Sequence, residues 1–180
     1  GVKGDMMKRI AMIILTVCLM ITMLPAKAAE ANDKAGTIIS VASKYIGVPY
    51  VYGGTSAKGF DCSGFTWFVY DAVGVSLPRT AKQQYDTGVS VERNKLEQGD
   101  LVFYSNTYKD GISHVGIYIG NNEFISATNS GVKVYSLDNS YWKPKYTGAK
   151  RILANQPSFK DVPANHFANT AIGTMAAGKI

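Results

Sequence analysis

Residues 59–65 read GFDCSGF, and this stretch predicts both a helix and a reactive group. Asp61 stands where a helix N-cap is expected, and the apolar run from Cys62 to Val73 predicts a helix that ends at Gly74. Cys62 would then lie in the first helical turn, where free backbone N–H groups and the helix dipole lower the pKa of a thiol. Cys62 is therefore a candidate nucleophile, although a free cysteine can also be a small core residue.

The N-terminal residues have the pattern of an export signal, which makes a single cysteine more informative. A short basic segment at residues 8–9 precedes an apolar run at 10–24, and Ala26-Lys27-Ala28 has the form of a signal-peptidase site. We expect residues 1–28 to be a signal peptide with an upstream extension; a retained membrane anchor is the alternative. Cleavage would leave 180 − 28 = 152 residues with Cys62 as their sole cysteine. We expect a secreted protein of the cell wall or extracellular space, without an internal disulfide.

Composition and charge exclude several classes of function. The whole chain has a net charge of +6, and residues 1–28 hold four basic residues and one acid, which leaves +3 for the remainder. A surplus of that size does not indicate a nucleic-acid partner. Clustered cysteine and histidine spacing is missing, so neither a metal site nor a cofactor is predicted. A redox role is not expected, because the sequence has no C-x-x-C motif. We also expect a monomer.

The order of the predicted elements indicates an α+β fold, with helices first and an antiparallel sheet second. Helical spacing of apolar residues predicts helices over residues 32–45, 62–73 and 79–86. Five β-rich runs separated by turns follow after Gly99, at residues 100–104, 114–119, 123–128, 132–137 and 149–153. The sequence therefore predicts one domain over residues 29–154, with N-terminal helices packed on a five- to six-stranded sheet, and a linker over 155–158.

A general base for the thiol has to come from the two histidines of the chain. His166 lies in the C-terminal tail, so His114 is the candidate inside the domain, at the start of a predicted strand. A cysteine on a helix facing a histidine on a strand is the geometry of papain-type enzymes. A histidine without a catalytic role is the alternative for His114.

Five motifs, in this order, resemble those of the NlpC-type cell-wall cysteine peptidases. The resemblance extends from about residue 34 to residue 153 and implies a papain-like fold. It also implies hydrolysis of peptidoglycan stem peptides, usually between D-glutamate and diaminopimelate or lysine. The motifs are VPYVYGG at residues 48–54, GFDCSGF at 59–65, LPRT at 77–80, QGDLVFY at 98–104 and HVGIYIG at 114–120.

Carried over by position, the resemblance makes Cys62 the nucleophile and His114 the base. Tyr50 matches a tyrosine whose hydroxyl helps to hold the oxyanion, although aromatic packing would also explain a tyrosine there. The substrate-binding positions of the family correspond to Asp61, Ser63 and Arg79. Asp61 would also serve as a helix cap, and Arg79 could have a structural role.

The third catalytic position departs from the family pattern. The family usually has histidine, and sometimes asparagine or glutamine, twelve residues after the base, where this chain has Ser126. A serine oxygen can accept the imidazole N–H but is shorter, and Asn129 or a backbone carbonyl could take its place. We expect a short turn to pair the two strands so that Ser126 lies across from His114 and supports it weakly. This departure favours one alternative to the endopeptidase, a non-catalytic wall-binding protein that keeps the fold. A further alternative, independent of Ser126, is an N-acetylmuramoyl-L-alanine amidase.

The C-terminal residues resemble a second family. Residues 159–180 are similar to the beginning of an S-layer homology module, which would bind wall polysaccharide. Only the first helix of such a module would be present, and a solvated terminal helix is the alternative. His166 would then belong to the module and not to catalysis.

Overall fold

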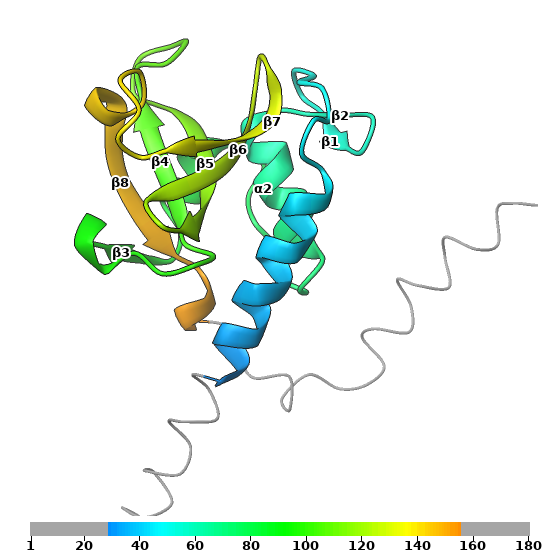
Figure 1. Ribbon diagram of the computed structural model, residues 1–180, viewed down its shortest axis with the longest axis vertical. Coiled ribbons are helices and arrows are strands. Elements are labelled where there is room, and N and C mark those ends of the chain that lie inside the picture. The colour runs from blue at the N-terminus through cyan, green and yellow to red at the C-terminus, as the bar shows by residue number, and fades with distance from the viewer. Residues whose placement is uncertain (1–28, 156–180) are drawn as a thin grey trace, which may run out of the picture.

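The computed structural model describes residues 29–155 of the chain (Figure 1). The predicted signal peptide at residues 1–28 and the predicted S-layer homology segment at 159–180, with His166, lie outside the described residues. Within the described part, no helix is both long and apolar enough to span a membrane.

Helices come first in the chain, as the sequence predicted. The N-terminal helix covers residues 29–44 and runs beside α2 (Cys62–Asp71), with both on the same side of the sheet (Figure 1). Asp61 caps α2 by accepting the backbone N–H of Gly64 at 2.7 Å, as its position before the apolar run predicted. The short α3 (Ala81–Tyr85) begins with a reciprocal capping box between Thr80 and Gln83.

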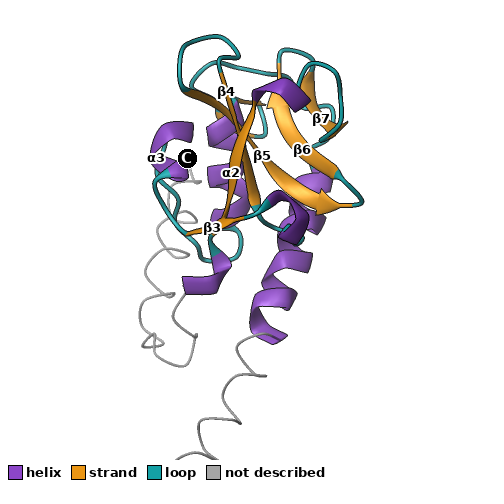
Figure 2. Cartoon of the chain, turned by 90° about the vertical axis from the view of Figure 1, so that its left-hand side faces the viewer, coloured by secondary structure: helices purple, strands orange, loops and turns teal. Residues whose placement is uncertain are grey.

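The second half of the domain is a six-stranded antiparallel sheet in the order β3-β8-β4-β5-β6-β7 (Figure 2). The chain turns between β5 and β6 at Asn121 and Asn122, whose φ angles of 51° and 61° are left-handed values that asparagine tolerates well. The α+β class and the antiparallel sheet are therefore confirmed. The strands are β3 (Val89–Val91), β4 (Leu101–Ser105), β5 (Ile112–Gly120), β6 (Glu123–Thr128), β7 (Gly131–Ser136) and β8 (Tyr146–Arg151).

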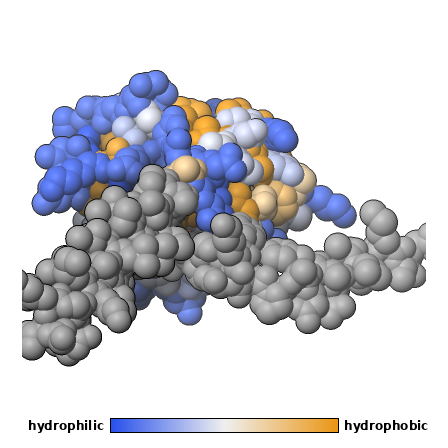
Figure 3. All heavy atoms as spheres, turned by 90° about the horizontal axis from the view of Figure 1, so that it is seen from below, coloured by the Kyte–Doolittle hydropathy of each residue, from blue (hydrophilic) through white to orange (hydrophobic). Residues whose placement is uncertain are grey.

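Alternation along the strands divides the apolar residues between the two faces of the sheet. Leu101 and Phe103 of β4 pack on the side of the helices, in the larger core cluster with Phe65 of α2. Val102 and Tyr104 face the other side, in a smaller cluster that the loop after β7 covers. Seen from below, the surface is more hydrophilic on the side of the sheet and more apolar on the side of the helices (Figure 3).

Some short elements were missed by the sequence analysis. The turn-rich segment before α2 contains a two-stranded hairpin of β1 (Thr55–Ser56) and β2 (Gly59–Phe60), and β3 has only three residues. Strands this short show too few alternations to be recognised as strands. The described part also contains three 3₁₀ turns, at Arg93–Lys95, Lys143–Lys145 and Leu153–Asn155.

Candidate active site

Cys62 is the first residue of α2 and lies where the helix meets the loop that carries Tyr50. The loop packs closely on the first turn, because a Cβ on Gly64 would lie 2.0 Å from the carbonyl oxygen of Gly54. Glycine at position 64 is therefore required for this contact. Asp61 also accepts the backbone N–H of Gly53 at 2.9 Å, which ties the loop to the start of the helix.

The thiol of Cys62 is 5% exposed and its pKa is shifted in the direction opposite to the one that the helix start predicted. Burial, followed by the charge of Asp61, raises the pKa of Cys62 to about 11. The backbone N–H groups of Val115 and Ser63 act in the opposite sense but are outweighed. The expectation of a lowered thiol pKa was therefore wrong for the resting site, and the sulfur is held as a neutral thiol.

His114 is the third residue of β5 and is buried, with 6% of its surface exposed. Burial lowers the pKa of His114 to about 3, so the imidazole is neutral at rest. Its Nε2 lies 2.7 Å from the hydroxyl of Ser126, which also donates to the carbonyl oxygen of Val115 at 2.8 Å. Since the hydroxyl has one proton and the carbonyl can only accept, the Ser126 oxygen accepts a hydrogen bond from Nε2–H. The neutral imidazole then keeps its lone pair on Nδ1.

The strand register places Ser126 diagonally from His114 and not directly across from it. Ile117 pairs with Ile125, so the next pair along is Gly116 with Ser126. The predicted cross-strand pair was wrong by two residues, although both side chains do lie on the same face of the sheet. Gly116 makes the diagonal contact possible, because a Cβ there would lie 3.1 Å from that of Ser126 and 2.5 Å from the ring of Phe124.

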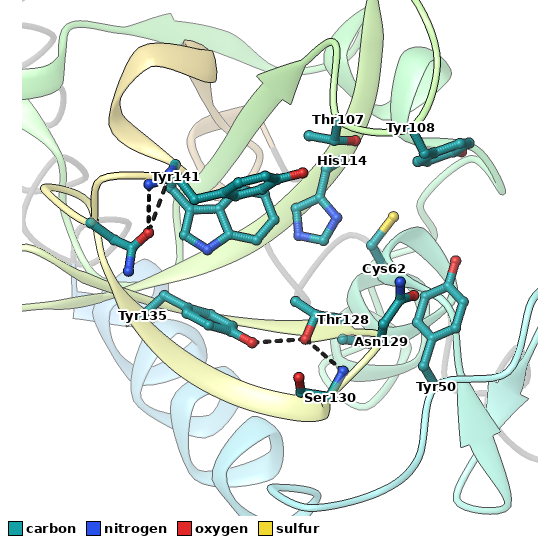
Figure 4. Close-up of a pocket in the computed structure, with 13 residues that line it drawn as sticks. Tyr50, Cys62, Thr107, Tyr108, His114, Thr128, Asn129, Ser130, Tyr135 and Tyr141 are labelled. Atoms are coloured by element: carbon teal, nitrogen blue, oxygen red, sulfur yellow. Dashed lines mark hydrogen bonds between the residues drawn. The ribbon is translucent and has the colours of Figure 1, made fainter.

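A cavity of about 450 Å³ contains both Cys62 and His114. Figure 4 shows the sulfur and the imidazole pointing into this cavity, with the hydroxyl end of Tyr50 on the far side of the sulfur. Burial and the proximity of Cys62 raise the pKa of Tyr50 to about 12, so its hydroxyl keeps its proton and can donate a hydrogen bond. The other lining residues are Thr107, Tyr108, Ala127, Thr128, Asn129, Ser130, Tyr135, Asn139, Tyr141 and Trp142.

The predicted substrate-binding residues form a separate cluster behind the nucleophile and do not line this cavity. Arg79 holds both carboxylate oxygens of Asp61, at 2.9 and 2.5 Å, and donates to the Ser63 hydroxyl at 3.0 Å. This bidentate pair joins the start of α2 to the segment before α3. The side chain of Arg79 is 39% exposed, whereas Asp61 is buried, so the cluster reaches the surface through the guanidinium.

Sequence reasoning missed the residues that surround His114. Trp142 stacks on the imidazole with ring centroids 4.6 Å apart and an interplanar angle of 26°. Tyr108 and Tyr141 lie at opposite ends of the cavity (Figure 4). Both Tyr141 and Trp142 come from the connection between β7 and β8, where no periodic pattern exists. The adjacent aromatic pair after Asn139 was the one available signal.

Comparison with known proteins identifies the family of this domain. The profile described as NlpC/P60 family matches residues 47–151 of the chain. A gamma-DL-glutamyl hydrolase and a probable peptidoglycan endopeptidase, LytE, both from Bacillus subtilis, are each 50% identical over 117 and 115 residues. Each alignment covers 63% of this chain but only 28% and 33% of the relative. The chain therefore corresponds to a third or less of these longer proteins.

A solved structure supports the same fold. The crystal structure of an NlpC/P60 family protein from Bacillus cereus superimposes with a TM-score of 0.63 at 35% sequence identity. The superposition covers 66% of this chain and 40% of that one. The papain-like arrangement expected from the sequence is thus confirmed.

Proposed function

This chain belongs to the NlpC/P60 family, and on that premise we propose that it is a peptidoglycan hydrolase that cuts stem peptides with Cys62 as its nucleophile. The observation that supports this most is the shared cavity of Cys62 and His114, with Ser126 bonded to the far nitrogen of the imidazole. The proposed target is the bond from γ-D-glutamate to diaminopimelate or lysine. The 50% identity to a protein named gamma-DL-glutamyl hydrolase favours this bond.

Acylation begins from a neutral thiol and a neutral imidazole. As the sulfur attacks the substrate carbonyl, the thiol proton passes to Nδ1 of His114, and the C–S bond forms. The hydroxyl of Tyr50 and the backbone N–H of Cys62 donate to the developing oxyanion. The C–N bond then breaks, the imidazolium gives its proton to the departing amine, and a thioester on Cys62 remains.

Deacylation reverses these roles. Nδ1 of His114 removes a proton from a water molecule, whose oxygen attacks the thioester carbonyl. The C–S bond breaks, the carboxylic acid product leaves, and the proton returns from the imidazolium to the sulfur. Through both halves Ser126 accepts the Nε2–H, so the same nitrogen of His114 always faces Cys62.

Substrate binding and location complete the proposal. Asp61, Ser63 and Arg79 would meet the part of the stem peptide that extends past α2, with Asp61 attracting a free amine. Their mutual bonds also support the helix start, so the two roles coexist. We further propose that the protein is exported, works as a monomer at the cell wall, and binds wall polysaccharide through residues 159–180.

Purified muropeptides provide a direct test. The full chain should release one product that ends in D-glutamate and another that begins with diaminopimelate or lysine, as identified by mass spectrometry. Release of the intact stem peptide from muramic acid would mean an amidase, and the absence of products would mean a non-catalytic binder. Either outcome overturns the proposal.

Cys62→Ala is the matched control for this assay. We expect it to abolish hydrolysis while circular dichroism and the melting temperature change little, because alanine is small and compatible with a helix start. Full turnover by the folded Cys62→Ala protein would exclude Cys62 as the nucleophile.

A further inference from the structure

The face of the catalytic imidazole is covered by an indole to which neither the motifs nor the proposed reaction assigns a role. The rings of Trp142 and His114 are nearly parallel, at 26°, with centroids 4.6 Å apart. Each residue is only 6% exposed. This stack fixes the plane of the imidazole, while Ser126 fixes its rotation within that plane.

The loop that carries Trp142 is built to hold the indole in place. The side-chain oxygen of Asn139 accepts the backbone N–H groups of Tyr141 and Trp142, at 2.9 and 3.4 Å. The backbone N–H of Lys143 donates to the carbonyl of Asn139 at 2.9 Å, and that of Lys145 to the carbonyl of Trp142 at 3.0 Å. Aromatic rings enclose the remaining sides of the indole, with centroid distances between 4.8 and 5.7 Å; they belong to Tyr104, Phe124, Tyr135 and Tyr141.

The surroundings of His114 give the indole an electrostatic role. The titratable groups around the imidazole are the thiol of Cys62, from α2, the phenol of Tyr104, from β4, and the phenols that line the same cavity, which belong to Tyr50, Tyr108, Tyr135 and Tyr141. Ser126 of β6 and Trp142 of the loop are neutral, and burial alone accounts for the lowered pKa of His114. Among the described residues no carboxylate pairs with His114. The imidazolium formed during acylation therefore has to be stabilised by neutral groups.

An indole face can supply part of that stabilisation. The π-system of tryptophan carries negative potential on its face, and a cation stacked on it out of water is favoured by an amount that corresponds to roughly tenfold in an equilibrium constant. We propose that Trp142 is a positioning residue that keeps the imidazole of His114 aligned with Cys62 and Ser126 and stabilises its protonated form. This inference rests on the proposed function, because it requires His114 to take the thiol proton.

The rate at which Cys62 is alkylated tests the inference without any peptide substrate. Iodoacetamide reacts with the thiolate. Direct loss of the thiol proton to water gives an alkylation rate that rises tenfold per pH unit, whereas transfer of the proton to Nδ1 gives a pH-independent rate between the pKa of His114 and that of Cys62. Trp142→Leu should lower this pH-independent rate about tenfold, while Trp142→Phe should retain most of it. An unchanged pH-independent rate in folded Trp142→Leu protein would overturn the proposal.

Phe124→Leu is the matched control for packing. Phe124 touches the indole edge-on, with a centroid distance of 5.7 Å and an angle of 87°, and belongs to the same apolar cluster as Trp142. Phe124→Leu should lower the melting temperature as a large-to-smaller core substitution does, yet leave the pH-independent alkylation rate unchanged. A loss of rate in Phe124→Leu as large as that in Trp142→Leu would reduce the effect to packing and overturn the electrostatic role.

Fluorinated tryptophan decides the matter if Trp142→Leu does not fold. The chain has two tryptophans, so Trp67→Phe leaves Trp142 as the only site of incorporation. Fluorination withdraws charge from the ring face with little change in shape, and should lower the logarithm of the pH-independent alkylation rate in proportion to the number of fluorines. A rate that does not respond would overturn the proposal. Because alkylation needs no peptide cleavage, failure of the muropeptide assay would be distinguishable from failure here.

Discussion

At the scale of the residue, the site depends on one hydroxyl proton. Ser126 is fully buried, and its proton goes to the carbonyl of Val115, which forces its oxygen to accept from Nε2 of His114. Histidine could act in the same way from that position, whereas a carboxylate would add a charge. Serine therefore sets the tautomer of the base but contributes only a dipole to the imidazolium.

Ser126→Ala should lower kcat/KM by roughly 10- to 100-fold, because it removes a hydrogen bond to a group that becomes charged, worth about 1.5–3 kcal/mol. Steady-state hydrolysis of a muropeptide measures this. Ser113→Ala is the control, since Ser113 is an equally buried hydroxyl on the same strand as His114 that bonds to Thr107 instead. A loss as complete as that of Cys62→Ala would make Ser126 indispensable and contradict its role as an orienting dipole.

At the scale of the element, β5 and β6 bring His114 and Ser126 together because Gly116 of β5 has no side chain. His114 and Gly116 lie on the same face of β5, and the open space at Gly116 is occupied by Phe124 and the Cβ of Ser126. Glycine in the middle of a strand is unfavourable by itself. Its presence here is explained by the diagonal contact that it permits.

Gly116→Ala should therefore destabilise the protein by about 1–3 kcal/mol, as overpacking does, and should lower activity by displacing Ser126. Urea unfolding and kcat/KM measure the two effects. Gly36→Ala is the matched control, because a Cβ on Gly36 of the N-terminal helix meets nothing within 4 Å. We expect it to be neutral or to stabilise by up to about 1 kcal/mol. Equal effects of the two substitutions would contradict this account of β5.

The elements also show what a sequence can predict and what it cannot. Asp61 as a cap and the alternation of β4 to β7 were predicted because caps and periodicity are local properties. The diagonal position of Ser126 relative to His114 was not predicted, because it depends on how the β5–β6 turn is built. Trp142 was missed because an irregular loop has no period, and the thiol pKa had the wrong sign because burial is a tertiary property.

At the scale of the whole molecule, the sheet is covered on both faces, and the site lies where the start of α2 meets the sheet. Cys62 belongs to the larger apolar cluster on the helix side, whereas His114 stacks against the smaller cluster on the other side. Joining two cores in this way buries both titratable groups of the proposed reaction. Burial in the fold therefore disfavours the charged forms of the Cys62 thiol and the His114 imidazole, so both stay neutral.

This burial predicts how stability depends on pH. The pKa of His114 is lowered from 6.5 to about 3, so below pH 6.5 the unfolded chain binds a proton that the folded protein does not. The free energy of unfolding should fall by up to about 1.4 kcal/mol per pH unit between these two values, and His114→Gln should remove that part of the slope. The pKa of Cys62 is raised from 9.0 to about 11, so stability should fall again above pH 9 as the unfolded thiol ionises. Cys62→Ala should remove the contribution of the thiol, whereas the loss caused by Tyr50, Tyr70 and Tyr104, whose pKa values burial also raises, should remain. Urea denaturation from pH 3 to pH 11 measures both limbs. An acid limb that is unchanged in folded His114→Gln protein would show that other groups cause it, and that His114 is not held neutral by the fold.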